Sequence, residues 1–101
     1  DLRNIMYTAQ LGKHGSFSIR YPRGRGVMVE WEKPFKEIPV GKAKVIRRGT
    51  DLAILSIGHI GNFVNSAIDK LESEHFSIAH YDMLFAKPLD EECLHKVFKT
   101  Y

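Results

Sequence analysis

Leu52-Ala53-Ile54-Leu55-Ser56-Ile57 is a nearly continuous apolar run of strand length. Such a run predicts a strand that is buried on both faces, as in a parallel sheet. The tight loop Gly58-His59-Ile60-Gly61 follows, and a further strand is predicted over Phe76–Asp82. Between them, apolar residues recur at the i, i+3, i+4, i+7 spacing of one helix face, at Val64, Ala67, Ile68 and Leu71. The order predicts a βαβ unit with a right-handed crossover and a parallel strand pair.

The flanks of this unit predict two more elements. Lys42–Arg47 has the pattern of an edge strand, and Arg48-Gly49-Thr50 makes the turn that follows it. Asp90 is a suitable N-cap for a last helix, because its carboxylate can accept hydrogen bonds from free backbone N–H groups. The apolar face of that helix is expected to consist of Leu94, Val97, Phe98 and Tyr101.

The N-terminal part of the sequence predicts a helix, a strand and a connector. The helix is indicated by the i, i+3, i+4, i+7 spacing of Leu2, Ile5, Met6 and Ala9. Gly12 to Gly15 end it, and Ser16–Arg20 alternates polar and apolar residues, the period of a half-buried strand. Residues 27–40 have the pattern of a connector, because Val27–Trp31 is extended in character and a polar stretch with Pro34 and Pro39 follows. Trp31 and Phe35 need a covering surface, so we expect the connector to lie against a domain.

Composition excludes several classes of function. The chain has 101 residues, 44% hydrophobic and 27% charged, with a net charge of +3. These values fit a small globular protein, and the mild charge does not indicate a nucleic-acid partner. No apolar run approaches the roughly 18 residues that span a bilayer, so no membrane role is expected. The single cysteine, Cys93, fits a reducing compartment such as the cytoplasm and a packing role.

Arg20-Tyr21-Pro22-Arg23-Gly24-Arg25-Gly26 is the stretch with the clearest binding chemistry. It places three guanidinium groups within six residues, with a proline that restricts the backbone and glycines that clear space. A guanidinium group is a planar fork that can bind two phosphate oxygens at once. The stretch therefore predicts a phosphate site, and the alternative of a solvated basic loop remains open.

The histidines give weaker indications. None of the five has the spacing of a metal ligand pair, and His14, His75 and His95 are expected in loops or in solvent. His59 follows a strand at the edge where active sites of open sheets gather, but a structural or interface role is preferred. His80 and Asp82 share one strand face, which permits an acid–imidazole pair, although structural polar groups are commoner. No catalytic, cofactor-binding or metal-binding residue is predicted.

Four blocks of sequence carry a resemblance to a known family. In order and spacing, the chain closely resembles the 1-deoxy-D-xylulose-5-phosphate synthases, thiamine-diphosphate-dependent relatives of transketolase. The resemblance covers the whole chain, and its blocks are Leu2–Ala9, Ser18–Gly24, Ile38–Lys42 and Tyr81–Asp90. Since the chain starts within one helix and stops on another, we expect a fragment of a larger α/β protein.

The resemblance implies a fold class, a domain plan and an activity. Residues 1–26 would end a pyrimidine-binding domain, 27–40 would be the connector, and 41–101 would be the first half of a transketolase C-terminal domain with a parallel sheet. The parent enzyme would be a cytoplasmic homo-oligomer that uses thiamine diphosphate and Mg²⁺. It would condense pyruvate with D-glyceraldehyde 3-phosphate and release carbon dioxide, while the fragment alone would be inactive.

The same resemblance implies a substrate-binding role for one residue. Arg23 stands where the family binds the phosphate of glyceraldehyde 3-phosphate, and Arg20 would be a supporting neighbour. The family's activating glutamate, its diphosphate–magnesium motif and its active-site histidines would precede Asp1. Leu84 replaces an arginine that is usual in the family, so no contact of that arginine is carried over. The alternatives are a non-catalytic dimerisation or docking module and a piece of a 2-oxo acid dehydrogenase β subunit.

Overall fold

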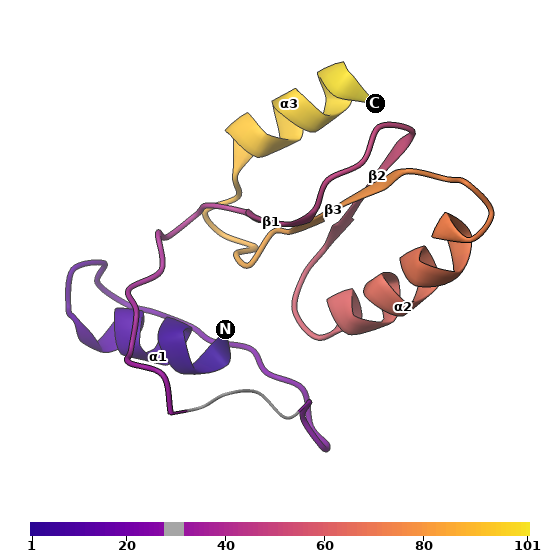
Figure 1. The fold of residues 1–101 in the computed structure, drawn as a ribbon. Helices are drawn as coiled ribbons and strands as arrows, with labels where there is room; N and C mark the ends of the chain where they lie inside the picture. Colours follow the sequence, from indigo (N-terminus) through magenta and orange to yellow (C-terminus); the bar gives the residue numbers. More distant parts are fainter. Residues whose placement is uncertain (28–31) are drawn as a thin grey trace. The chain divides into compact units, whose positions relative to one another are not determined.

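The computed structural model describes residues 1–27 and 32–101, in two compact units, Asp1–Pro39 and Val40–Tyr101 (Figure 1). Helix α1 (Leu2–Gln10) lies in the first unit. Strands β1 (Lys44–Arg47), β2 (Leu52–Ser56) and β3 (Ile78–Asp82) lie in the second unit with helices α2 (Ile60–Glu72) and α3 (Glu91–Thr100). The helix over the first residues and the strand–helix–strand order are therefore confirmed.

The predicted strand over Ser16–Arg20 is wrong. These residues form no strand in the structure, and Phe17 and Ile19 are half-buried while the polar residues between them are exposed. The alternation of polar and apolar side chains is present, but a strand also requires a neighbouring strand to bond its backbone. None of the described residues of the first unit forms one.

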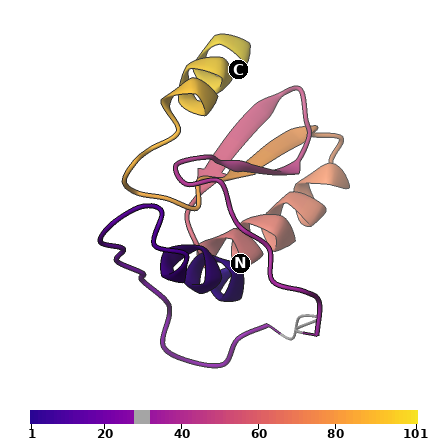
Figure 2. The same cartoon turned by 90° about the vertical axis from the view of Figure 1, so that its left-hand side faces the viewer.

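The second unit is built on a three-stranded sheet in the order β1-β3-β2. β2 and β3 are parallel, with Leu52 opposite Ile78 and Ser56 opposite Asp82, so the predicted βαβ pairing is confirmed. β1 runs antiparallel to β3, which makes the sheet mixed. Figure 2 shows this sheet turned by 90°, with α2 alongside it, and α2 packs against β2 and β3.

Burial follows this strand order. β3, the central strand, is buried at Ile78, Ala79, His80 and Asp82. β2 is an outer strand of the described sheet, and Leu52 is 51% exposed, so the expectation that this run is buried on both faces is wrong here. Apolar side chains from both sides of β3 form the core, which comprises Ile68, Ile78, Ala79, Met83, Phe85 and Val97.

The last helix confirms its predicted cap and corrects its predicted face. Asp90 is the N-cap of α3, and its Oδ1 accepts a hydrogen bond from the Cys93 N–H at 3.0 Å. Val97 is buried, but Phe98 is 75% exposed. The inward stripe contains Val97 with the half-buried Cys93 and Leu94, one turn earlier. Cys93 and Val97 are four apart and share the inward face, while Phe98, four residues after the half-buried Leu94, is exposed.

The link between β1 and β2 is closely packed. A side chain at Gly49 would overlap the backbone of Ile78 and Ala79, so glycine alone fits there. Next to it, the Asp51 carboxylate accepts a hydrogen bond from the Ser77 N–H at 2.8 Å. This bond lowers the pKa of Asp51. The Tyr101 hydroxyl donates to the Gly49 carbonyl at 2.7 Å, which ties the end of α3 to this turn.

Candidate functional site

The arginine loop, residues 20–26, lies in the first unit and is exposed throughout. Gly24 has a φ of +135°, a conformation that residues with a side chain rarely adopt. Across residues 1–27 and 32–101, no hydrogen bond or ion pair engages Arg20, Arg23 or Arg25. Three cationic forks that pair with no described residue can receive an anion without first breaking an ion pair to the described part of the chain.

Residues after the loop return to helix α1. The Ile38 N–H donates to the Thr8 hydroxyl at 2.8 Å. The Phe35 ring stacks on Tyr7 with 5.2 Å between ring centroids, and the Arg3 guanidinium lies 4.0 Å from the Phe35 centroid. The expected contact of the connector with a domain is confirmed for Phe35, while Trp31 lies outside the described residues.

A second polar cluster lies between the sheet and α2. His80 is 1% exposed, and its Nε2 lies 2.8 Å from the Ser56 Oγ. Its Nδ1 lies 2.8 Å from the Asn65 Oδ1. Since Oδ1 can only accept, Nδ1 carries the ring proton, and the Ser56 hydroxyl donates to Nε2. Burial lowers the pKa of His80, because the charged imidazolium would lose its hydration.

This cluster decides between the two readings of His80. The ring nitrogens bond to Ser56 and Asn65 rather than to Asp82, so the structural role is confirmed and the acid–imidazole pair is not formed. Asp82 instead accepts a hydrogen bond from the Leu84 N–H at 3.1 Å. The sequence reasoning missed Asn65, although a polar residue next to Val64 and Ile68 on the apolar side of a helix is a recognisable pattern.

The loop before α2 has ordinary turn chemistry. The Gly61 N–H donates to the Gly58 carbonyl at 3.1 Å, and Gly58 has a φ of +71°. His59 is exposed and is the N-cap residue of α2, but its side chain makes no capping hydrogen bond to the backbone of the helix.

Two sequence blocks that are far apart in the chain meet at the start of β1. Gly41, with a φ of +72°, lies against the Pro88 ring, where a side chain would leave 2.8 Å to Cγ. Asp90 accepts a hydrogen bond from the Ala43 N–H at 2.8 Å, and the Lys42 ammonium contacts Glu92 at 2.8 Å. The bonds from Ala43 and Cys93 lower the pKa of Asp90. This clasp fixes where the chain enters the second unit.

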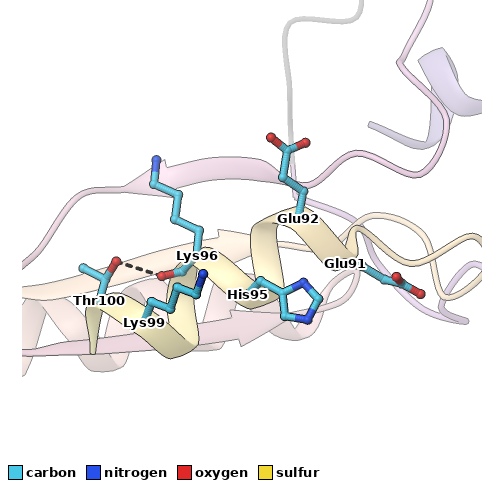
Figure 3. Close-up of a pocket in the computed structure, with 6 residues that line it drawn as sticks. All are labelled: Glu91, Glu92, His95, Lys96, Lys99 and Thr100. Carbon is cyan, nitrogen blue, oxygen red and sulfur yellow. Dashed lines mark hydrogen bonds between the residues drawn. The ribbon is translucent and has the colours of Figure 1, made fainter.

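The surface of α3 has a shallow hollow between its own side chains, Glu91, Glu92, His95, Lys96, Lys99 and Thr100 (Figure 3). Its six lining residues come from one helix and are exposed, and the hydrogen bond drawn among them runs from the Thr100 hydroxyl to the Lys96 carbonyl at 2.7 Å. It is the solvated outer face of α3. His95 lies on this face, as predicted.

The described side chains offer no site for the implied magnesium ion. In residues 1–27 and 32–101, no group of three or more His, Cys, Asp or Glu side chains could hold a metal ion. A magnesium–diphosphate site needs several oxygen ligands at one place.

Burial raises the pKa of the Cys93 thiol, which disfavours the reactive thiolate. Within the described part of the chain, no helix is long and apolar enough to cross a membrane.

The mixed sheet with its covering helix defines an α/β domain of the transketolase type, and comparison with known proteins supports this class. Residues 41–101 match the family described as "Transketolase, C-terminal domain", and the chain belongs to that family. A solved structure titled "Split gene transketolase, inactive beta4 tetramer" superposes with a TM-score of 0.62. It is 26% identical and covers 67% of this chain and 23% of its own.

The particular relatives are 1-deoxy-D-xylulose-5-phosphate synthases. The enzyme of Cytophaga hutchinsonii is 60% identical over 102 residues, and that of Bacteroides thetaiotaomicron is 58% identical. Both matches cover 100% of this chain, which spans 16% of the length of each relative. The chain thus corresponds to one segment of these synthases, and the resemblance seen in the sequence blocks is confirmed.

Proposed function

We propose that this chain is part of a 1-deoxy-D-xylulose-5-phosphate synthase. The intact enzyme would condense pyruvate with D-glyceraldehyde 3-phosphate, release carbon dioxide and supply a precursor of isoprenoids, thiamine and pyridoxal. The observation that carries the proposal is the 60% identity to the Cytophaga hutchinsonii synthase over the whole chain. Because of this match, we prefer the synthase to the alternative, a piece of a 2-oxo acid dehydrogenase β subunit.

Within that enzyme, Arg23 would bind the phosphate of glyceraldehyde 3-phosphate, with Arg20 as a supporting neighbour. The phosphate is remote from the aldehyde carbon, so binding it orients the substrate without taking part in bond formation. The exposed guanidinium of Arg23 and the open backbone at Gly24 support this role. A phosphate dianion bound by a guanidinium fork gains charge-assisted hydrogen bonds, which are stronger than neutral ones.

Kinetics of Arg23→Ala in the intact enzyme test this assignment. We expect kcat/KM for glyceraldehyde 3-phosphate to fall roughly 10- to 100-fold, the range for losing hydrogen bonds to a charged group, with KM for pyruvate unchanged. Arg48→Ala is the matched control, because it removes an exposed arginine from the other unit. Wild-type kinetics of Arg23→Ala would contradict the role of Arg23.

A chimera tests the family function of the whole segment. Residues 1–101 would replace the matching segment of the Cytophaga hutchinsonii synthase, where the two sequences are 60% identical. We expect the chimera to fold and to form 1-deoxy-D-xylulose 5-phosphate. A folded chimera without activity, restored by returning the Cytophaga segment, would mean that this segment no longer supports the reaction.

The isolated segment is proposed to be inactive and to bind neither thiamine diphosphate nor Mg²⁺. The support is the composition of its described residues, which offer no cluster of metal ligands. Thiamine diphosphate in the intact enzyme supplies the carbanion chemistry, and this segment would contribute substrate binding. Titration calorimetry of the 101-residue chain with both cofactors should show no heat of binding, and micromolar affinity would contradict the proposal.

A dimerisation or docking role is the second candidate. It is supported by the two outer strands of the described sheet and by the solved relative, whose title calls it an inactive tetramer. An outer strand exposes unpaired backbone groups that another chain can bind. Light scattering after size-exclusion chromatography should show a homo-oligomer, and a monomer at high micromolar concentration would remove this candidate.

A further inference from the structure

We propose that Thr8 is a positioning residue for the arginine loop. Its buried hydroxyl fastens the segment that follows the loop to helix α1, so that the stretch carrying Arg20 and Arg23 is tied at both ends. The inference rests on the proposed phosphate-binding role of Arg23. It assigns to that site a buried residue whose side chain points away from solvent.

The Thr8 hydroxyl is fully used. Thr8 is 0% exposed, and its Oγ1 donates to the Asn4 carbonyl at 2.8 Å. The same oxygen accepts a hydrogen bond from the Ile38 N–H at 2.8 Å. A hydroxyl has one proton and two lone pairs, so both bonds form together. The second bond joins residues that are 30 positions apart in the chain.

Three further contacts lie along the same side of α1. The Lys36 N–H donates to the Asn4 Oδ1 at 3.2 Å. The Phe35 ring contacts both the Tyr7 ring and the Arg3 guanidinium. Positions 3, 4, 7 and 8 are neighbours on a helix surface because they are spaced three and four apart. Residues 35–38 therefore bind one stripe of α1, and Thr8 is the buried contact in that stripe.

The result is a loop that closes on a single helix. The stretch carrying Arg20 and Arg23 leaves α1 after Gln10 and returns to it at Phe35. At the surface, the Lys13 ammonium and the Glu37 carboxylate join its two ends at 2.8 Å. Closing a loop restricts the positions that its residues can reach. No described residue pairs with Arg23, so the ties of the stretch to α1 are the contacts that restrict the positions of its backbone.

Thr8→Val removes the hydroxyl with little change of volume and leaves the Ile38 N–H without its acceptor. In the intact enzyme, kcat/KM for glyceraldehyde 3-phosphate should fall roughly three- to tenfold, an effect in the range seen when packed contacts couple two sites. KM for pyruvate and kcat/KM for unphosphorylated D-glyceraldehyde should not change. Thr8→Ser keeps the hydroxyl and should restore wild-type kinetics.

Thr100→Val is the matched control. The Thr100 hydroxyl also donates to the carbonyl four residues earlier, at 2.7 Å, but it lies on α3 in the other unit and is exposed. Its kinetics should equal those of the wild type. Equal losses for the phosphorylated and unphosphorylated aldehydes in Thr8→Val would overturn the proposal, because they would indicate general damage to the active site.

A double-mutant cycle separates this inference from the proposed function. In the Arg23→Ala background, Thr8→Val should cause no further loss, because its effect passes through Arg23. If Arg23→Ala itself has wild-type kinetics, the phosphate assignment fails. If Arg23→Ala is impaired and Thr8→Val is not, the assignment stands and the positioning role is overturned.

A surface variant covers the case in which Thr8→Val does not fold. Lys13→Met breaks the exposed tie to Glu37 without touching a buried group. It should raise KM for glyceraldehyde 3-phosphate about twofold, since an exposed ion pair contributes little, and leave KM for pyruvate unchanged. An unfolded Thr8→Val together with wild-type kinetics of Lys13→Met would overturn the proposal.

Discussion

The two units of the chain differ in what holds them together. In Val40–Tyr101, a central strand pairs with a neighbour on each side, and the described residues of the buried apolar core lie in this unit. Among residues 1–27 and 32–39, the buried residue is Thr8, and single side-chain contacts fasten the chain to one helix. The exposed arginines of the loop lie in Asp1–Pro39, the less tightly packed unit. Binding residues often lie on loops that a more rigid element positions.

The largest expected effect comes from filling the closest backbone approach in the sheet unit. Gly49→Val places a side chain against the backbone of Ile78 and Ala79, so the central strand must move or the unit must unfold. We expect a loss of more than about 3 kcal/mol in the free energy of unfolding, as for severe overpacking. Urea denaturation of the 101-residue chain, followed by circular dichroism, measures it.

Gly26→Ala is the control for this prediction. Apart from its two chain neighbours, no atom of the described residues lies within 4 Å of where its Cβ would stand, so stability should change by less than about 0.5 kcal/mol. Equal effects of the two substitutions would mean that the packing contrast between the units does not exist.

Acidification should weaken the sheet unit through His80. Burial lowers the pKa of His80 below its ordinary value of 6.5; Asp82 opposes this shift, and Arg47 adds to it. The unfolded chain therefore binds a proton before the folded one does. Stability is complete above about pH 6.5 and falls below it, by at most about 1.4 kcal/mol per pH unit.

The measurement is the urea midpoint at pH 7.5, 6.5 and 5.5. His80→Gln cannot gain a proton at this position, so its stability should fall less over the same range. The contribution of His80 is refuted if the wild type and His80→Gln change in parallel. Ser56 and Asn65 remain in place in both proteins, so the difference reports the imidazole alone.

A smaller effect is expected at the clasp between β1 and α3. Asp90→Ala removes the N-cap of α3 and the acceptor of the Ala43 N–H. The cost should be about 1 kcal/mol, the usual value for a lost cap. Asp90→Asn, which keeps an acceptor oxygen, should lose less. Because hydrogen bonds lower the pKa of Asp90, its contribution is present above pH 3.8 and is lost as the pH falls through the lower pKa of the folded state.

The smallest effect tests the corrected face of α3. Phe98→Ser changes a side chain that is 75% exposed and should alter stability by less than about 0.5 kcal/mol. Val97→Ala removes apolar atoms from a buried position and should cost about 1.5 kcal/mol. The assigned face would be wrong if Phe98→Ser proved the more damaging change in thermal unfolding of the 101-residue chain.

Short stretches of sequence predicted those helices, strands and caps that depend mainly on adjacent residues. The helical spacing of Val64 and Ile68, the cap at Asp90 and the apolar run at Leu52 each specify an element through adjacent side chains, and each element formed. The exposed face of Phe98 was not predicted, because a helix with several apolar residues fits more than one face. The strand at Ser16–Arg20 was predicted wrongly, because alternation specifies a strand only where a partner strand is available.

In the candidate site, too, some features were predicted from the sequence and others were not. The arginine pattern predicted a phosphate site, and the exposure of Arg23 is consistent with that prediction, which stays untested. The contacts of Thr8 could not be predicted, because Ile38 is far from it in the sequence. Ser56 was missed for the same reason, and neither Ser56 nor Asn65 shows from the sequence alone that β3 brings His80 between them.

By itself, the sequence determined the helices, the strand–helix–strand order and the family, because these depend on local periodicity and on blocks of residues in fixed order. The tertiary structure decided that β3 is central, that His80 is a structural group, and that Thr8 joins the arginine-bearing stretch back to its own helix. The physical reason is that hydrogen bonds and burial depend on distance in space, which residue order fixes only over a few positions.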